Sequence, residues 1–294
     1  MESETTITEQ NIESPKTAKK NINRLKVLGT VFTILGLGLF AYFIYAVGVS
    51  EILAGITKIG FGGFAIILFI YFLRISVRST SWRLAVLSPY KLGYKDTFTA
   101  VIIGEALSSI IPLGILVSGT AKAIAVRKKV PLVVGFSSVA TENLFYSLIT
   151  GLFISFGAFA FLRRFEIDPT WTYLIDFIIA FIFAAIVIGS LMVIRQWHWA
   201  SSLCEWFYNR GFFPNILREG RKQIRVIENQ IYGFYRKHPK RFFPLCGLQV
   251  LFHSLGIFEV WFILTRIGDS FPAISTAFYL ESMSRLITIV FKLI

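Results

Sequence analysis

The sequence is poor in charged residues and in cysteine, and it lacks the common catalytic motifs. Charged residues make up 16% of the 294 residues, whereas they make up about 25% of an ordinary soluble domain. The two cysteines, Cys204 and Cys246, lie in or beside expected cytoplasmic or membrane segments, which argues against a disulfide framework. Motifs of the P-loop, HExxH, GxSxG and CxxC types are absent, and the three histidines are scattered. We therefore expect a protein that is neither a soluble domain nor an enzyme and that binds no metal and no cofactor.

Hydrophobic residues dominate instead. They make up 55% of the chain, which includes thirty Phe and six Trp. They occur in runs of about 18 to 30 residues, and a helix of that length crosses about 30 Å of hydrocarbon. The sequence thus predicts an all-α fold, a polytopic helical membrane bundle of about six to seven membrane segments. The expected runs are residues 27–48, 61–73, 132–162, 171–194, 242–264 and 271–294.

Two of these runs differ from a simple span. The run 61–73 is short, so it either draws in residues 56–60 or lets the Arg74 side chain snorkel to the membrane surface. The run 271–294 contains charged residues, and it either spans the membrane or enters and leaves on one face. Because the chain stops inside that run, we also expect the membrane domain to lack its C-terminal end.

The segment 97–121 decides the topology. It is apolar enough to span, yet it contains Glu105, Pro112, Gly114 and Gly119. If it enters and leaves on the cytoplasmic side, 24 basic residues lie inside and four outside; if it crosses completely, the numbers become 13 and 15. Because cytoplasmic loops are enriched in Lys and Arg, this distribution favours a re-entrant helical hairpin and a cytoplasmic N-terminus. Pro112 and Gly114 suit the tip, since proline interrupts the helical hydrogen-bond ladder and glycine tolerates unusual backbone angles.

A hairpin inside the bilayer has a further consequence. Non-helical backbone at membrane depth survives only where protein or a water-filled cavity covers it, so the hairpin predicts an internal site. The alternative is a kinked helix that spans the membrane completely, with basic residues divided almost equally between the two sides.

Basic residues gather beside the apolar runs. Fourteen of the 30 lie in residues 122–129 and 195–241, and a membrane surface explains this better than nucleic acid does. Residues 1–23 are polar and without hydrophobic periodicity, which predicts a disordered cytoplasmic tail. Residues 24–294 form the membrane domain, in which 195–241 is a basic cytoplasmic loop with an amphipathic interfacial helix.

Ionisable residues inside the membrane are the best candidates for a functional site, because a charge at the bilayer centre costs at least about 2.5 kcal/mol. The expected set is Glu105, Glu142, Asp176, Glu259, Glu281 and Arg285. Asp176 lies near the outer end of its run, where water is close, so we favour a structural role for it. Glu259 and His253 are six residues apart and fall on different helix faces, which makes them a weak pair.

Two pairs in this set are stronger candidates. Glu105 lies on the expected hairpin and Glu142 on a polar stripe of the next helix, and we expect both to face one interior cavity. The alternative is that either carboxylate only caps a helix or pairs with Arg127, Lys122 or a neighbouring helix. Glu281 and Arg285 are four residues apart on one helix face, where they can neutralise each other. They either stabilise the helix or bind a zwitterionic or phosphate-bearing group.

A series of motifs follows a fixed order along the chain. It comprises Arg78 and Trp82-Arg83, the run Ile111-Pro112-Leu113-Gly114 leading through Gly119 to Lys122, the Glu142-bearing helix, and the stretch from Glu281 to Arg285. Together these motifs resemble the flippase-like membrane region of lysylphosphatidylglycerol synthetase/flippases, over roughly residues 25–294. The resemblance implies a lipid-translocating unit of the bacterial inner membrane, with re-entrant elements and a cavity for a phospholipid headgroup. These 294 residues hold no counterpart of the relatives' soluble aminoacyltransferase domain, so we expect a stand-alone flippase-like region.

The expected function is therefore translocation of a phospholipid, aminoacylated or not, or of a related amphiphile between leaflets. Glu105 and Glu142 would attract a cationic headgroup, while Lys122 and Arg285 would balance its phosphate and Glu281 would complete the substrate-binding set. The hairpin would be shaped by Pro112, Gly114 and Gly119.

The expected partners are membrane phospholipids and anionic lipid headgroups at the cytoplasmic face. A homo-oligomer and a separate lipid-modifying enzyme stay open as further partners. One alternative function is that of a membrane-bound accessory or enzyme of polyprenyl-phosphate or glycolipid biosynthesis, with Glu105 or Glu142 as base. Another is a structural subunit of a membrane complex.

Overall fold

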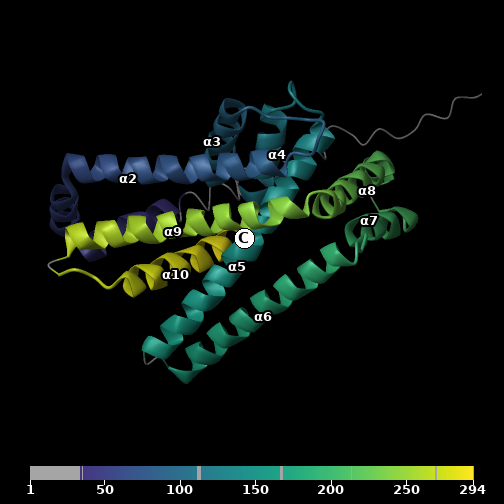
Figure 1. Ribbon diagram of the computed structural model, residues 1–294. Helices are drawn as coiled ribbons and strands as arrows, with labels where there is room; N and C mark the ends of the chain where they lie inside the picture. Colours follow the sequence, from purple (N-terminus) through teal and green to yellow (C-terminus); the bar gives the residue numbers. More distant parts are fainter. Residues whose placement is uncertain are drawn as a thin grey trace, which may run out of the picture. The chain divides into compact units, whose positions relative to one another are not determined.

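The computed structural model describes residues 34, 36–110, 114–165, 168–212, 214–268 and 270–293, and within these ranges the regular structure is helical throughout (Figure 1). The predicted all-α class is thereby confirmed. The chain divides into two compact units, Met1–Lys58 and Ile59–Ile294. All the residues of the candidate site described below belong to the second unit.

Four of the described helical segments are long and apolar enough to cross a membrane. They are α2 (Val49–Ala85), α5 (Leu132–Arg164), the Thr172–Ile194 part of α6 (Pro169–Ile194), and Pro239–Ile267, which joins η1 (Pro239–Arg241) to α9 (Phe242–Ile267). They coincide with four of the predicted runs, and they confirm a multi-pass helical membrane protein. A shorter apolar helix, Gly36–Val47, covers the described part of the first run. The helix α10 (Ile274–Leu293) covers the last run but is not one of the four.

The helix α2 is longer than its predicted apolar run. Its backbone is interrupted at Gly60, where φ is 63° and ψ is 176°, a conformation that glycine adopts more readily than other residues. Beyond this break the helix continues through Ala85, well past Arg74. Arg74 does not snorkel to the surface, because it is only 9% exposed and pairs with carboxylates inside the bundle. Arg74, Arg78 and Lys122 therefore leave the count of cytoplasmic loop charges, and 21 of the 24 remain.

The predicted hairpin corresponds to two short helices, α3 (Tyr94–Ile110) and α4 (Gly114–Ala125), which pack against each other. At Gly104 of α3, a Cβ atom would lie 2.8 Å from Cγ of Lys122 and 3.0 Å from the carbonyl oxygen of Ser118. A residue without a side chain is therefore needed for this close approach. Pro112 lies in 111–113, outside the described residues, so its place at the tip stays a prediction.

The chain leaves this hairpin next to the point where it entered. Val86 and Leu92, which precede α3, share one buried hydrophobic cluster with Val126 and Val130, which follow α4. The two helices have 17 and 12 residues, which correspond to lengths of about 25 and 18 Å and are less than the roughly 30 Å of a bilayer core. Entry and exit at one end agree with the predicted hairpin and disagree with a complete crossing.

The long helix α5 connects the remaining elements of the second unit. It packs against α4, α6, α8 (Pro214–Lys237), α9 and α10, and α10 also packs against α9 (Figure 1). Gly119 of α4 faces Val139 of α5, whose Cγ1 atom lies 3.5 Å from where a Cβ would be. The hairpin, α5 and α10 are therefore held around one region, where the candidate site lies.

The basic loop 195–241 folds into α7 (Trp199–Asn209) and α8, which pack against each other. The Glu228 carboxylate of α8 accepts hydrogen bonds from the backbone N–H groups of Ala200 (2.9 Å) and Ser201 (3.4 Å) at the first turn of α7. Trp199 and Trp206 of α7 remain exposed, as an interfacial position requires. The placement of this pair at a membrane surface stays a prediction.

We predict that the loops before α3 and after α4 lie on the same side of the membrane. In a Cys204→Ser/Cys246→Ser background, Lys91→Cys and Lys128→Cys replace exposed residues of these two loops. A membrane-impermeant maleimide should label both from one side of oriented vesicles. Arg164→Cys, at the far end of α5, should be labelled from the other side. Labelling of Lys91→Cys and Lys128→Cys from opposite sides would contradict the hairpin.

Candidate functional site

Charged side chains gather between the helices of the second unit in two neutral groups. Each group contains two cations and two carboxylates, and the shortest ion-pair distance in each is 2.5–2.6 Å. The first group comprises Arg78, Lys122, Glu105 and Glu142, and the second comprises Arg74, Arg285, Glu259 and Glu281. Because a buried charge without a partner is strongly unfavourable, this balance is what lets the helices pack here.

The first group is centred on Arg78 of α2. Its Nη1 atom donates to Oε1 of Glu105 on α3 at 2.5 Å, and its Nε atom lies 3.7 Å from Oε1 of Glu142 on α5. Lys122 of α4 places its Nζ atom 3.6 Å from Oε1 of Glu105. Four helices are thus joined by one arginine and one lysine.

The second group joins α2, α9 and α10. Arg74 donates from Nη1 to Oε2 of Glu259 at 2.6 Å, and its Nη2 lies 3.6 Å from Oε1 of Glu281. The same Glu281 oxygen accepts from Nε and Nη2 of Arg285 at 2.8 and 2.7 Å. A Cβ on Gly256 of α9 would lie 2.4 Å from that oxygen, so the glycine makes room for this carboxylate.

One aromatic ring stands among the three arginines. The Cζ atoms of Arg74, Arg78 and Arg285 lie 4.7, 5.9 and 5.6 Å from the centre of the Phe252 ring. Arg78 also lies 4.7 Å from the centre of the Tyr146 ring. Rings at this distance attract cations through their quadrupole, and a guanidinium can stack on them. The three guanidinium groups are therefore brought close together despite their like charge.

Polar side chains behind the arginines fix the first group in place. Gln249 of α9 donates from Nε2 to Oγ of Ser81 at 2.8 Å and to Oε1 of Glu142 at 3.4 Å. All of these residues are buried, and buried polar groups that are hydrogen-bonded resist displacement.

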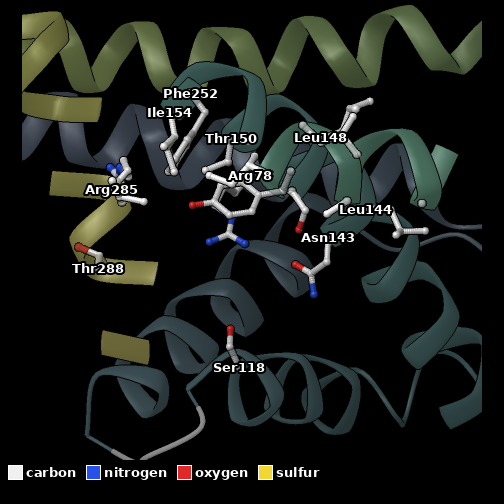
Figure 2. Close-up of a pocket in the computed structure, with 18 of the residues that line it drawn as sticks. Arg78, Ser118, Asn143, Leu144, Leu148, Thr150, Ile154, Phe252, Arg285 and Thr288 are labelled. Carbon is white, nitrogen blue, oxygen red and sulfur yellow. The ribbon is translucent and has the colours of Figure 1, made fainter. Parts of the chain in front are cut away.

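A cavity of about 780 Å³ opens beside the two groups. Its volume is in the range of about 300 to 1,000 Å³ that is typical of ligand sites. One wall is polar and includes Arg74, Arg78, Glu105, Ser118, Arg285 and Thr288. Another part of the lining is a largely apolar face of α6 and includes Phe181, Ile182, Ala185, Ile186, Val193 and Ile194. Figure 2 shows Arg78 between Arg285 and Thr288 on one side and Asn143 on the other, with Ser118 across from it.

A tyrosine from the basic loop reaches the cavity as well. Tyr235 of α8 belongs to the lining, and burial raises the pKa of its hydroxyl to about 12. Its hydroxyl therefore stays protonated at neutral pH and adds no negative charge.

The structure brings the predicted site residues together but gives them different positions. Glu105 and Arg285 line the cavity. The expectation that Glu142 faces the cavity is wrong: Glu142 and Lys122 are each only 2% exposed and lie behind the lining, where they form part of the first group. Glu281 is 6% exposed and holds Arg285. The predicted role of these residues in substrate binding stays a prediction.

Sequence reasoning named Glu259 among the intramembrane candidates but found only a weak partner for it. It did not place Arg74 in the site and treated Arg78 only as part of a motif. The spacing of Arg74 and Arg78, four residues apart on one helix, was a usable signal. His253 was correctly separated from Glu259, since its Nε2 atom lies 2.9 Å from Oγ1 of Thr150 instead. In the described ranges, no three His, Cys, Asp or Glu side chains are grouped to hold a metal ion.

We predict that Glu281→Gln destabilises the protein more than the double variant Glu281→Gln/Arg285→Gln. The single change leaves Arg74 and Arg285 with Glu259 alone, and removing one partner from a buried ion pair costs about 3–5 kcal/mol. The double change restores neutrality. Thermal unfolding in detergent should therefore give the lower melting temperature for the single variant. Asp176→Asn, at an exposed position of α6, is the control and should leave the melting temperature unchanged. A double variant at least as unstable as the single one would argue against neutralisation as the basis of the network.

The comparison with known proteins covers all the helices that build this site. The family described as the lysylphosphatidylglycerol synthase TM region matches residues 27–291. No curated protein matches the chain, and no solved structure matches it. The resemblance seen in the sequence motifs is thereby confirmed: the chain belongs to the lysylphosphatidylglycerol synthase TM region family.

Proposed function

We propose that this protein moves a phospholipid or a related amphiphile between the two leaflets of the bacterial inner membrane, with its N-terminus in the cytoplasm. The observation that carries the proposal is the mixed lining of the cavity, which combines charged and hydroxyl groups with an apolar face of α6. Membership of the family supports a lipid-related function in a membrane.

The main obstacle to lipid translocation is the polar headgroup. An unpaired charge or an unbonded polar group is expensive to place in hydrocarbon. The polar wall offers the headgroup hydrogen-bond donors and charges in place of water. Because the two charged groups are neutral as a whole, the protein can keep these side chains at membrane depth without a ligand.

The acyl chains have a different requirement, since they must stay in an apolar environment throughout. The helix α6 suits this role, because none of the residues in the most apolar stretch of Thr172–Ile194 is buried by the rest of the protein. One face of this stretch lines the cavity and includes Ile182, Ile186 and Val193. We infer that acyl chains lie along α6 while the headgroup meets the polar wall.

We predict that Gly189→Phe blocks lipid translocation. Gly189 of α6 lines the cavity, and a Cβ added there would meet no atom within 4 Å. A phenylalanine at this position should therefore project into the cavity and narrow it beside α6 without disturbing the packing. Reconstituted vesicles with a fluorescent phospholipid and an impermeant quencher measure the exchange between leaflets. We expect exchange with the unchanged protein and at least about a tenfold slower rate with the variant, an increase of about 1.4 kcal/mol in the barrier.

The matched control is Gly247→Phe on α9. A Cβ there also meets no atom within 4 Å, and Gly247 is exposed and does not belong to the cavity lining. It should leave the exchange rate unchanged. Equal rates for the unchanged protein, both variants and protein-free vesicles would refute translocation through this cavity.

A further inference from the structure

We propose that the cavity binds its lipid through the negatively charged phosphate and prefers an anionic phospholipid to an aminoacylated, cationic one. This inference rests on the proposed function and deepens it by naming the class of headgroup. It differs from the sequence-based expectation, in which carboxylates attract a cationic headgroup.

The first observation is the charge that the network presents to the cavity. Three guanidinium groups belong to the lining, those of Arg74, Arg78 and Arg285. Of the four carboxylates in the two charged groups, Glu105 alone belongs to it, as far as the described residues show. Although the network is neutral as a whole, the surface that a ligand meets carries three cations and one anion.

The second observation concerns the carboxylates that do not line the cavity. Glu142 is only 2% exposed, and its Oε1 atom is held by Gln249. The Glu281 carboxylate is occupied by a two-donor contact from Arg285. Glu259 accepts from Arg74 at 2.6 Å. A cationic headgroup would have to displace an arginine to reach any of them, whereas a phosphate meets the arginines directly.

The third observation is unused hydrogen-bonding capacity on the arginines. The Nε atoms of Arg74 and Arg78 are buried and have no hydrogen-bond partner. A guanidinium has five N–H donors in a fork that matches two oxygens of a phosphate. Buried donors without a partner are rare in proteins and call for an explanation. Nε of Arg78 lies 3.7 Å from Oε1 of the buried Glu142, so Nε of Arg74 is the donor that a small rotation would offer to an anion in the cavity.

Glu105 has a distinct place in this arrangement. Its Oε1 atom accepts from Arg78 at 2.5 Å, and its side chain is 27% exposed at the cavity. A bound phosphate would occupy the same side of Arg78, so Glu105 competes with the ligand for this arginine. Because of this competition, the effect of a Glu105 variant on binding affinity should have opposite directions for anionic and cationic headgroups. Removing the Glu105 charge should help an anion to bind and should hinder a cation.

The first experiment measures binding without transport. Native mass spectrometry of the detergent-solubilised full chain gives the Kd values of phosphatidylglycerol, phosphatidylcholine and lysylphosphatidylglycerol with identical acyl chains. We expect phosphatidylglycerol to bind at least about tenfold more tightly than lysylphosphatidylglycerol, the ratio that one charge-assisted hydrogen bond provides. Equal Kd values, or tighter binding of the cationic lipid, would overturn the inference.

A soluble competitor separates a lipid headgroup from a free phosphate. Glycerophosphoglycerol, the deacylated form of phosphatidylglycerol, carries the same phosphodiester but has no acyl chains for the α6 wall. It should compete with phosphatidylglycerol only at concentrations far above the lipid's Kd. If it binds as tightly as the lipid, the site recognises a soluble anion and the assignment to a phospholipid is wrong.

Three variants test the residues in the same assay. Arg285→Gln should weaken phosphatidylglycerol binding by about tenfold, and Arg285→Lys, which keeps the charge, should weaken it less. Glu105→Gln should leave the affinity for phosphatidylglycerol unchanged or increase it. Arg266→Gln removes an exposed cation outside the cavity and should change nothing. A loss of phosphatidylglycerol binding in Glu105→Gln would contradict the inference.

The binding assay tests the headgroup assignment and the vesicle assay tests the proposed function, so either conclusion can be wrong without the other. Binding in the expected order without exchange between leaflets would remove the proposed function and leave the headgroup assignment intact. Exchange between leaflets with a reversed order of Kd values would do the opposite.

Discussion

Charge buried in a membrane bundle must be neutralised by neighbouring charge, and this constraint organises the second unit. Four cations and four carboxylates meet there, from α2, α3, α4, α5, α9 and α10. In a medium of low dielectric each partner holds the other in place. The helices that supply these side chains cannot shift independently, since a small movement would leave a buried charge unpaired. The cavity therefore takes its shape from the ion pairs as much as from apolar packing.

The local features of this arrangement could be predicted from the sequence. Helical periodicity alone puts Glu281 and Arg285 on one face, and the structure shows them in contact. The pairing of α3 and α4 agrees with the hairpin that the loop charge favoured, whereas its tip and its depth in the membrane stay predictions. The cluster of Val86, Leu92, Val126 and Val130 shows that the chain returns to the end where it entered. Each of these features depends on residues that are close in sequence or on a property of whole loops.

The distant pairings could not be predicted. Arg74 and Glu259 are 185 residues apart, and no periodicity relates positions on different helices. Read alone, Arg74 follows an apolar run and has the appearance of a snorkelling residue. Its side chain points inward because it pairs with Glu259 on α9 and Glu281 on α10. Gly256 leaves space for the Glu281 carboxylate. Which of the predicted residues line the cavity and which are buried could not be predicted either, because the exposure of a side chain depends on tertiary packing.

That division changes the chemistry which the site can perform. Glu142 and Lys122 are buried behind the lining, whereas Arg74, Arg78 and Arg285 belong to it. On the proposed function, a ligand would therefore contact the arginines and not the buried pair. On the proposed function, a phosphate that enters would take the place of Glu105 on Arg78, and Glu105 would return when the phosphate leaves. Arg78 would thus be paired in both states, so neither the empty nor the loaded cavity would hold an unpaired guanidinium. A site of this kind lowers the barrier for a charged headgroup without binding it so tightly that release becomes slow, which is the balance that passage between leaflets requires.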